Sequence, residues 1–282
     1  MKLLLIGASG YVGSSLYSKL SQNHEVTGTH YKHSDKHPNL VLLDLNNQKN
    51  ISDVLRQEAP DVVVHVGGLT SVDYCERNKE EATRLNTDGV RRIIDNFGGK
   101  VIYVSTNYVF DGSRGNYTES DPTNPVNHYG LTKARAEEII IEHPDNLVVR
   151  FGSVYGLNPR NNKFFNRFFE NGEPKNKIDG SPELMLSPTY LSDVIQNFEQ
   201  FFEYTGIIHF TSGSPISEYD FFAEISKGLN LGFEVSVRSF DEICKIARRP
   251  RNATLSTERD LPFARTSLED SLRDIHSVLK NP

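Results

Sequence analysis

The sequence predicts an α/β fold: a doubly wound parallel sheet with a smaller, discontinuous C-terminal lobe. Three observations lead to this fold class. Short apolar runs alternate with longer amphipathic stretches over residues 1–151, a glycine-rich turn directly follows the first apolar run, and the alternation weakens in the remaining 131 residues of the 282-residue chain. Parallel neighbours in a sheet need long crossover connections, which helices usually supply. Strand and helix alternation therefore favours a parallel sheet with helices on both faces.

The first half of the chain supplies the predicted strands and helices in order. Short apolar runs predict strands at 2–6, 25–29, 40–43, 61–66, 100–105 and 146–151. The amphipathic stretches between them predict helices at 11–22, 51–58, 76–97 and 129–142. Each predicted helix is long enough to carry the chain back to the start of a parallel strand.

The second half is less regular, because prolines at positions 159, 174, 182, 188 and 215 divide it into short elements. A helix at 191–204 and a strand at 207–210 are still expected to join the sheet. We therefore predict one domain from 1–151 with a return at about 189–211. The second lobe is then formed by 152–188 and 212–282.

Composition narrows the function classes. The net charge is −6 and the pI is near 5.9, which argues against nucleic acid as a partner because phosphate binding needs a broad excess of Lys and Arg. No apolar run approaches the ~20 residues that span a bilayer, and we read no secretion signal at the start. A cytoplasmic protein without a membrane partner is expected. Cys75 and Cys244 lack neighbours at metal-ligand spacing, so we predict free thiols and no metal site.

The glycine-rich turn predicts a dinucleotide site. Gly7, Gly10 and Gly13 follow the first strand and open a helix, together with Tyr11 and Val12. Glycines there permit a tight turn and bring backbone N–H groups close to a pyrophosphate at the positive end of the helix dipole. We therefore expect 1–151 to be a Rossmann-type domain that binds a dinucleotide.

The second strand indicates which dinucleotide. NAD-preferring domains place Asp or Glu about 20 residues after the glycines, whereas this chain has His30 and Lys32 there. Neutral or basic side chains favour the 2′-phosphate of NADP(H), and NAD(H) is left open. Further cofactor contacts are expected where later strands end, from Asp44 and Leu45 and then from Gly67, Gly68 and Leu69.

A tyrosine and a lysine share one helix face. Tyr129 and Lys133 are four residues apart in the run HYGLTKARAE, so both side chains can point into one cleft. A nearby positive charge lowers a phenol's pKa from its usual ~10, which makes Tyr129 a candidate proton donor. Thr106, with Ser105 as second choice, lies where the fifth strand is expected to end and can polarise a substrate carbonyl.

At these residues the chain resembles the extended short-chain dehydrogenases/reductases, and more narrowly the dTDP-4-dehydrorhamnose reductase family. The resemblance extends over nearly the whole length and rests on segments in the family's order: GASGYVG, PDVVVHVGGLTSVDYCE with LNTDG, STNYVFDG, NPVNHYGLTK, VVRFGSVYG, LSPTYLSDV and RRPRNATL. The chain departs from the family at Asn107, usually Asp, at Gly67 and Gly68, usually alanines, and at Ser153, where the family has tryptophan.

The resemblance implies hydride transfer from NADPH or NADH to the C4 keto group of a nucleotide-linked deoxyhexose. Thr106 would bind the carbonyl oxygen, Tyr129 would donate the proton, and Lys133 would hold the nicotinamide ribose. The expected substrate contacts are Thr70, Val72, Asn107, Tyr108, Ser153, Arg249 and Arg251, the two arginines for the pyrophosphate. Two alternatives stay open: a nucleotide-sugar epimerase on the same fold, and a noncatalytic NADP-binding protein resembling the regulatory subunit of methionine adenosyltransferase. A homodimer is also left open.

Overall fold

The computed structural model describes residues 1–31, 39–158, 161 and 163–280. Its centre is a seven-stranded sheet in which every neighbouring pair is parallel, in the order β13-β6-β5-β4-β1-β2-β3. The strands are β1 (Lys2–Ile6), β2 (Glu25–His30), β3 (Val41–Leu42), β4 (Val62–His65), β5 (Lys100–Thr106), β6 (Leu147–Phe151) and β13 (Gly206–Phe210). The predicted fold class is confirmed, and so is the late return of a strand to the sheet.

The strand order reverses beside β1. β2 pairs with one edge of β1 and β4 with the other, so the connections leaving β1 and β4 run in opposite directions. In open α/β sheets, ligands bind at such a point, beyond the carboxyl ends of the strands. The glycine turn lies at this end of β1.

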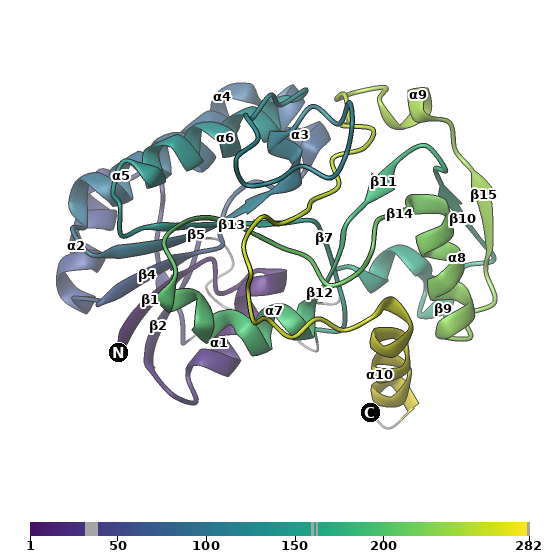
Figure 1. The fold of residues 1–282 in the computed structure, drawn as a ribbon. Helices are drawn as coiled ribbons and strands as arrows, with labels where there is room; N and C mark the ends of the chain where they lie inside the picture. The colour runs from purple at the N-terminus through teal and green to yellow at the C-terminus, as the bar shows by residue number, and fades with distance from the viewer. Residues whose placement is uncertain (32–38, 159–160, 162, 281–282) are drawn as a thin grey trace.

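Helices cover both faces of the sheet (Figure 1). On one face lie α1 (Tyr11–Leu20) and α7 (Leu191–Asn197), which is followed by a 3₁₀ turn at Phe198–Glu203. On the other lie α2 (Gln48–Glu58), α5 (Gly89–Asn96) and α6 (His128–Ile141). Two apolar cores result, because alternate residues of each strand point to opposite faces: Leu3 and Leu5 pack toward α1, whereas Leu4 and Ile6 pack toward α5.

The single helix predicted over 76–97 is wrong. The structure has α3 (Val72–Arg77), α4 (Lys79–Thr83), a π-helical turn at Arg84–Asp88 and then α5. Asn78 interrupts the first part with φ −126° and ψ 57°. The π turn has a local purpose: Asn86 accepts a hydrogen bond from the Leu69 N–H at 2.8 Å and donates one to the Leu69 carbonyl at 2.9 Å. Through these two hydrogen bonds, Asn86 in the π turn holds the loop that follows β4 in place.

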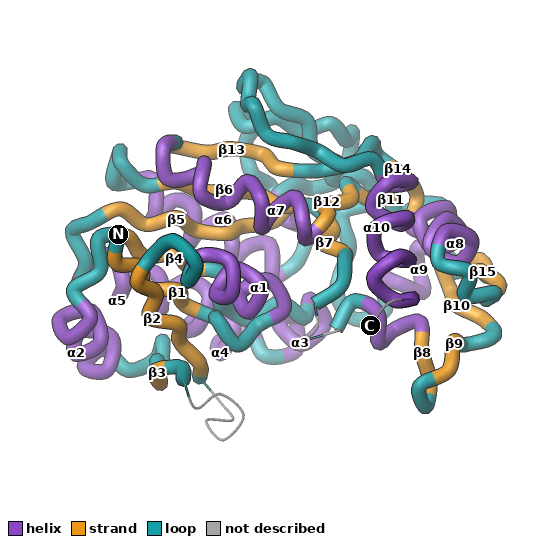
Figure 2. The backbone as a smooth tube through the Cα atoms, turned by 90° about the horizontal axis from the view of Figure 1, so that it is seen from below, coloured by secondary structure: helices purple, strands orange, loops and turns teal. Residues whose placement is uncertain are grey.

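The second lobe consists of short pieces beside one end of the sheet (Figure 2). Its strands are β7 (Ser153–Tyr155), β8 (Phe169–Glu170), β9 (Glu173–Pro174), β10 (Lys177–Gly180), β11 (Met185–Leu186), β12 (Pro188–Tyr190), β14 (Ile216–Ser217) and β15 (Glu234–Val237), which form two-stranded pairs. Its helices are α8 (Glu218–Gly228), α9 (Phe240–Ile243) and α10 (Leu268–Lys280). An aromatic core that includes Phe164, Phe168, Phe221 and Phe233 holds these pieces together.

One segment that we assigned to the second lobe returns to the sheet. Ala253 and Leu255 pack against Val109 and Phe110, next to the 3₁₀ turn at Asn107–Val109, and Phe263 joins the core beneath α7. Figure 1 shows this yellow segment passing the β13 edge of the sheet before the chain enters α10. The exact domain boundaries stay a prediction.

In the described part of the chain, no helix is long and apolar enough to cross a membrane. Among the same residues, no group of three or more His, Cys, Asp or Glu side chains is placed to hold a metal ion. Cys75 and Cys244 are free thiols, as expected.

Candidate active site

The glycine turn is packed so closely that side chains are excluded. Gly7 has φ +92°, and a Cβ added to it would lie 2.7 Å from the Gly67 Cα. A Cβ on Gly13 would lie 2.1 Å from the Gly7 carbonyl oxygen. Gly10 is the N-cap of α1 and no side chain caps the helix there, so no capping side chain occupies the backbone N–H groups of the first turn. This geometry suits an anionic group at the helix N-terminus.

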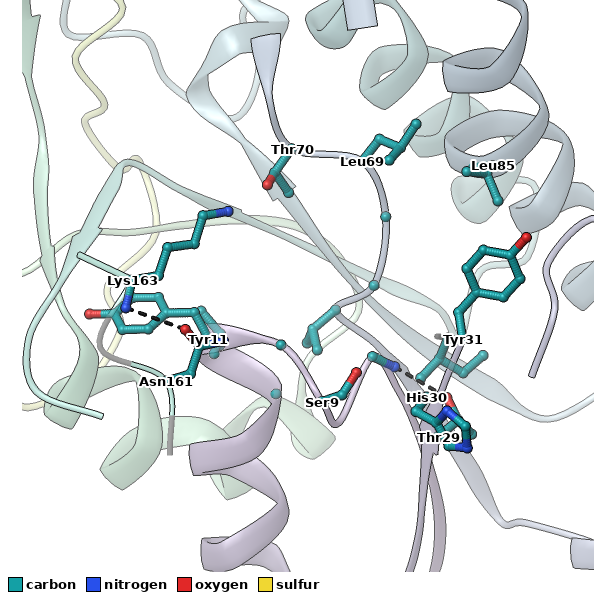
Figure 3. Close-up of a pocket in the computed structure, with 18 of the residues that line it drawn as sticks. Ser9, Tyr11, Thr29, His30, Tyr31, Leu69, Thr70, Leu85, Asn161 and Lys163 are labelled. Atoms are coloured by element: carbon teal, nitrogen blue, oxygen red, sulfur yellow. Dashed lines mark hydrogen bonds between the residues drawn. The ribbon is translucent and has the colours of Figure 1, made fainter. Parts of the chain in front are cut away.

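A cavity of about 580 Å³ opens at this turn. It gathers eleven of the residues predicted to bind cofactor or substrate: Gly7, Gly10, Tyr11, Val12, Gly13, His30, Leu45, Gly67, Gly68, Leu69 and Thr70. Figure 3 shows Thr29, His30 and Tyr31 at one end and Tyr11 and Lys163 at the other. The cavity therefore extends from the end of β2, across the glycine turn, to the second lobe.

Sequence reasoning missed several lining residues. They include Ser9, Thr29, Tyr31, Leu43, Val66 and Leu85. Thr29 also accepts a hydrogen bond from the Gly7 N–H at 3.3 Å (Figure 3). Its position next to His30, at the end of a predicted strand, was the available signal.

Asp44 and Lys32 are two further predicted cofactor residues. Asp44 does not line the cavity, because its carboxylate accepts hydrogen bonds from the backbone and side chain of Asn46 at 2.9 and 3.2 Å. Asp44 thus stabilises its own turn, as many aspartates in loops do. Lys32 lies outside the described residues.

A second cavity, of about 160 Å³, contains the predicted catalytic residues. Thr106, Tyr129 and Lys133 line it together with Ser105 and Asn86. Both cavities share seven lining residues: Val12, Val66, Gly67, Gly68, Leu69, Thr70 and Val154. The predicted catalytic group thus lies beside the predicted dinucleotide site, with a common wall.

Tyr129 is held in the first turn of α6. Asn127 caps this helix by accepting a hydrogen bond from the Gly130 N–H at 2.8 Å. Gly130 packs against the Tyr108 backbone so tightly that an added Cβ would lie 2.1 Å from its carbonyl oxygen. The Tyr129 ring, 8% exposed, also contacts Tyr108 edge to face with centroids 5.9 Å apart. The phenol is therefore fixed by both backbone and ring packing.

The expected lowering of the Tyr129 pKa is contradicted. Burial raises the pKa of Tyr129 well above its usual value, and a hydrogen bond with Thr106 opposes this only in part. Lys133 is not among the causes of the shift in the Tyr129 pKa. The Tyr129 phenol therefore carries its proton throughout the neutral range.

Lys133 is buried and lies on the same face of α6 as Tyr129. Its Nζ donates a hydrogen bond to the Val104 carbonyl at 2.8 Å and lies 4.0 Å from the centroid of the Tyr103 ring. Burial lowers the Lys133 pKa to about 7, and the negative charge of Glu137 opposes that shift. The amine is thus poised between its charged and neutral forms near neutral pH.

Glu137 continues this face one turn further and is paired with Arg150. The Arg150 Nε lies 3.0 and 3.1 Å from the two carboxylate oxygens, and Nη2 lies 2.7 Å from one of them. The side chains are 2% and 3% exposed. Because two buried charges neutralise each other here, the pair ties α6 to β6 without leaving an uncompensated charge.

The predicted substrate residues separate into two sets. Thr70 lines both cavities. Val72, Asn107, Tyr108 and Ser153 line neither. Asn107 instead donates to the Ala253 carbonyl at 2.9 Å. At β7 it is Val154 that lines both cavities, because successive side chains of a strand point to opposite sides.

The two arginines expected at the pyrophosphate are engaged with carboxylates. Arg249 lies 2.8 Å from Asp73, and Arg251 lies 2.5 Å from Glu183. Neither lines either cavity. Among the described residues of the second lobe, Lys163 and Arg167 are the basic ones that line the large cavity. Sequence reasoning passed over them because four phenylalanines in the same stretch indicated core packing.

The chain is similar to known proteins over nearly its whole length. Residues 1–281 match the family model described as RmlD substrate binding domain. Methionine adenosyltransferase 2 subunit beta of Danio rerio is 27% identical over 97% of this chain and 89% of its own length. The dTDP-4-dehydrorhamnose reductase of Salmonella typhimurium is 27% identical over 92% of this chain and 90% of its own.

Among solved structures, the dTDP-4-dehydrorhamnose reductase of Bacillus anthracis in complex with NADP superimposes with a TM-score of 0.86. It is 24% identical, and the match covers 98% of this chain and 99% of that one. The family match spans the cavity-lining residues as well as both parts of the fold. The chain therefore belongs to the RmlD substrate binding domain family.

Proposed function

We propose that this protein is an NADP(H)-dependent reductase that acts on the 4-keto group of a nucleotide-linked deoxyhexose. The observation that carries the proposal is the convergence of Thr106, Tyr129 and Lys133 on one small cavity that shares its wall with the cavity at the glycine turn. The Salmonella typhimurium reductase, similar over most of both chains, supports the reaction class.

The residues present fit a dinucleotide. Gly7 and Gly13 allow the tight backbone packing of this turn, where an added Cβ would lie 2.7 and 2.1 Å from backbone atoms, and the N-terminus of α1 favours negative charge. The last residue of β2 is His30 rather than an acidic residue, which supports NADP(H) over NAD(H). The Bacillus anthracis structure, which shares this fold, was solved with NADP. When bound, the cofactor supplies the hydride.

The chain's own residues supply the proton and hold the geometry. Tyr129, whose pKa is raised by burial, is protonated at neutral pH and donates to the carbonyl oxygen of the substrate. The Thr106 hydroxyl donates a hydrogen bond to the same oxygen. Lys133 binds the nicotinamide ribose, and Glu137 beneath it favours the charged amine. Proton donation of this kind contributes about 10²- to 10⁴-fold in rate.

A second candidate is favoured by one observation. The match to methionine adenosyltransferase 2 subunit beta covers 97% of this chain, which supports a noncatalytic, NADP-binding regulatory role. The retained side chains of Thr106, Tyr129 and Lys133 weigh toward catalysis, although the same residues also suit cofactor binding.

The deciding experiment combines purified protein, NADPH and a 4-keto sugar nucleotide, and follows the absorbance of the reduced nicotinamide. Steady loss of absorbance supports the reductase. Tight cofactor binding with interconversion of sugars but no net oxidation would identify an epimerase, and binding without either would identify the regulatory role. A cytoplasmic location and a homodimer are further expectations, to be tested by fractionation and by light scattering.

A further inference from the structure

The second-lobe wall of the large cavity is basic, in a protein whose net charge is −6. Lys163 and Arg167 line this cavity along with Phe164. Figure 3 shows Lys163 beside Tyr11, at the end of the cavity away from His30 and Tyr31. These cations therefore lie apart from the end of β2, where a 2′-phosphate is expected.

Arg167 is held in place by aromatic rings. Its guanidinium carbon lies 5.2 Å from the centroid of Phe164 and 5.8 Å from that of Phe222. Phe164 and Phe222 belong to the buried core of the lobe. Rings in fixed positions orient a planar guanidinium and restrict its rotamers, so its N–H groups stay available in a limited range of directions.

The charge of Arg167 is not neutralised by a direct partner in the described part of the chain. No carboxylate there lies within ion-pair distance of it. Burial lowers the pKa of Arg167, and the charge of Glu218 opposes that shift. The Glu218 carboxylate is already engaged, since it lies 3.6 Å from Arg238 and accepts the Ser181 N–H at 3.1 Å. Glu218 is therefore engaged by Arg238 and Ser181 and not by Arg167, which leaves excess positive charge beside the cavity.

Arg249 and Arg251 differ from Arg167 in having carboxylate partners. Each has one within 3 Å. An anionic ligand would have to displace Asp73 or Glu183 to reach them. Arg167 carries no such competitor among the described residues, so an anion that enters the cavity meets it directly.

We propose that Arg167 and Lys163 form a diphosphate subsite on the second lobe, facing the glycine turn. The ligand is the diphosphate of a nucleotide, from either the dinucleotide or the nucleotide-linked sugar. This choice of ligands rests on the proposed function, whereas the basic wall itself does not. Guanidinium and ammonium groups bind phosphate oxygens through short, charge-assisted hydrogen bonds.

The test measures binding alone. Full-length protein with Arg167→Gln is titrated with NADPH by fluorescence and with dTDP by calorimetry. Loss of one charge-assisted contact is expected to weaken binding of one ligand by about 10- to 100-fold. A weaker NADPH complex assigns the subsite to the cofactor, and a weaker dTDP complex assigns it to the sugar nucleotide. Arg167→Lys, which keeps the charge, is expected to restore part of the affinity.

Three further variants test the interpretation. Arg273→Gln, on the exposed surface of α10, is the matched control and should bind both ligands as the parent does. Unchanged affinities for both ligands in Arg167→Gln would overturn the proposal, as would a larger loss in Arg251→Gln than in Arg167→Gln. If Arg167→Gln does not fold, Lys163→Gln is measured instead, with thermal melting to establish that the protein is native. Because neither titration needs turnover, absence of reductase activity would not by itself overturn the subsite.

Discussion

The two walls of the large cavity are built differently. The sheet-domain wall consists largely of backbone: a glycine turn, the first turn of α1 and the ends of parallel strands. The Thr29 side chain joins it by accepting a hydrogen bond from the Gly7 N–H. The second-lobe wall consists of side chains on short elements, held by an aromatic core. The first arrangement fixes positions within a rigid sheet. The second supplies charge and shape that can vary without disturbing the sheet.

Arg150 and Arg167 differ in the same way as the two walls. Arg150, 2% exposed, is fully engaged by Glu137 and also lies 3.2 Å from the His209 ring nitrogen Nε2. Arg167 lies near the rings of Phe164 and Phe222 and lines the cavity. A guanidinium buried with its partner organises the fold, whereas one that borders a cavity without a carboxylate at its side can serve a ligand.

The largest expected effect is on catalysis at the sheet-domain wall. Tyr129→Phe removes the proton donor but keeps the ring against Tyr108, so kcat should fall by about 10²- to 10⁴-fold with little change in NADPH affinity. Steady-state kinetics and a cofactor titration measure the two. Tyr74→Phe, which removes an exposed hydroxyl that contacts Glu81, should leave kcat unchanged. An active Tyr129→Phe enzyme would remove the basis for the assigned proton donor.

The next effect tests the pair that ties α6 to β6. Arg150→Met leaves the Glu137 carboxylate buried without a partner, which should destabilise folding by about 3–5 kcal/mol. Urea denaturation gives this free energy. The double variant Arg150→Met with Glu137→Gln should recover much of the loss, because no unpaired charge remains. Equal losses in single and double variants would show that packing, and not charge, dominates at this site.

A comparable effect is expected in the aromatic core of the second lobe. Phe168 is completely buried and stacks on Phe233 with centroids 5.4 Å apart. Phe168→Ala should cost about 3–5 kcal/mol through lost contacts and a cavity. Val237→Ala, at a site that is 68% exposed, should change stability by about 0.5 kcal/mol or less. If Phe168→Ala shows a separate early transition in thermal melting, the lobe unfolds independently of the sheet.

The smallest effect is a pH dependence from Lys133. Its pKa is lowered by burial to about 7 in the folded protein, below the usual ~10.4 of an unfolded chain. Above pH 7 the unfolded state binds more protons than the folded state, so stability should rise with pH, by at most about 1.4 kcal/mol per unit. The contribution is constant below pH 7, where both states are protonated. Lys133→Met should flatten this slope between pH 7 and 9 in urea unfolding, and an unchanged slope would contradict the assignment.

The sequence was most informative where the structural signal is local. Strand and helix alternation gave the sheet, and the glycine turn and the Tyr129 and Lys133 spacing identified residues that the structure gathers at connected cavities. The prediction of one helix over 76–97 failed because the amphipathic pattern continues across Asn78 and the π turn. The backbone leaves the helical region at Asn78, and at the π turn the Asn86 side chain is hydrogen-bonded to Leu69. Periodicity reveals neither feature.

Other predictions depended on tertiary contacts that no local pattern reveals. A dense group of arginines gave no sign that Asp73 and Glu183 lie against two of them. Arg167 was hidden among phenylalanines, although those rings are what orient it. At β7 the alignment of family motifs pointed to Ser153, whereas the facing residue is its neighbour Val154. A shift of one residue in a strand exchanges the two sides.

The segment that passes the β13 edge of the sheet before α10 bears on how far the second lobe can move. A wide swing of the second lobe would pull Leu255 and Phe263 out of apolar sites where they are 5% and 7% exposed. Removing such side chains from their cores costs free energy, so the packing of Leu255 and Phe263 opposes a wide swing of the second lobe. Less of a ligand's binding free energy would then be spent on rearranging the two parts of the protein.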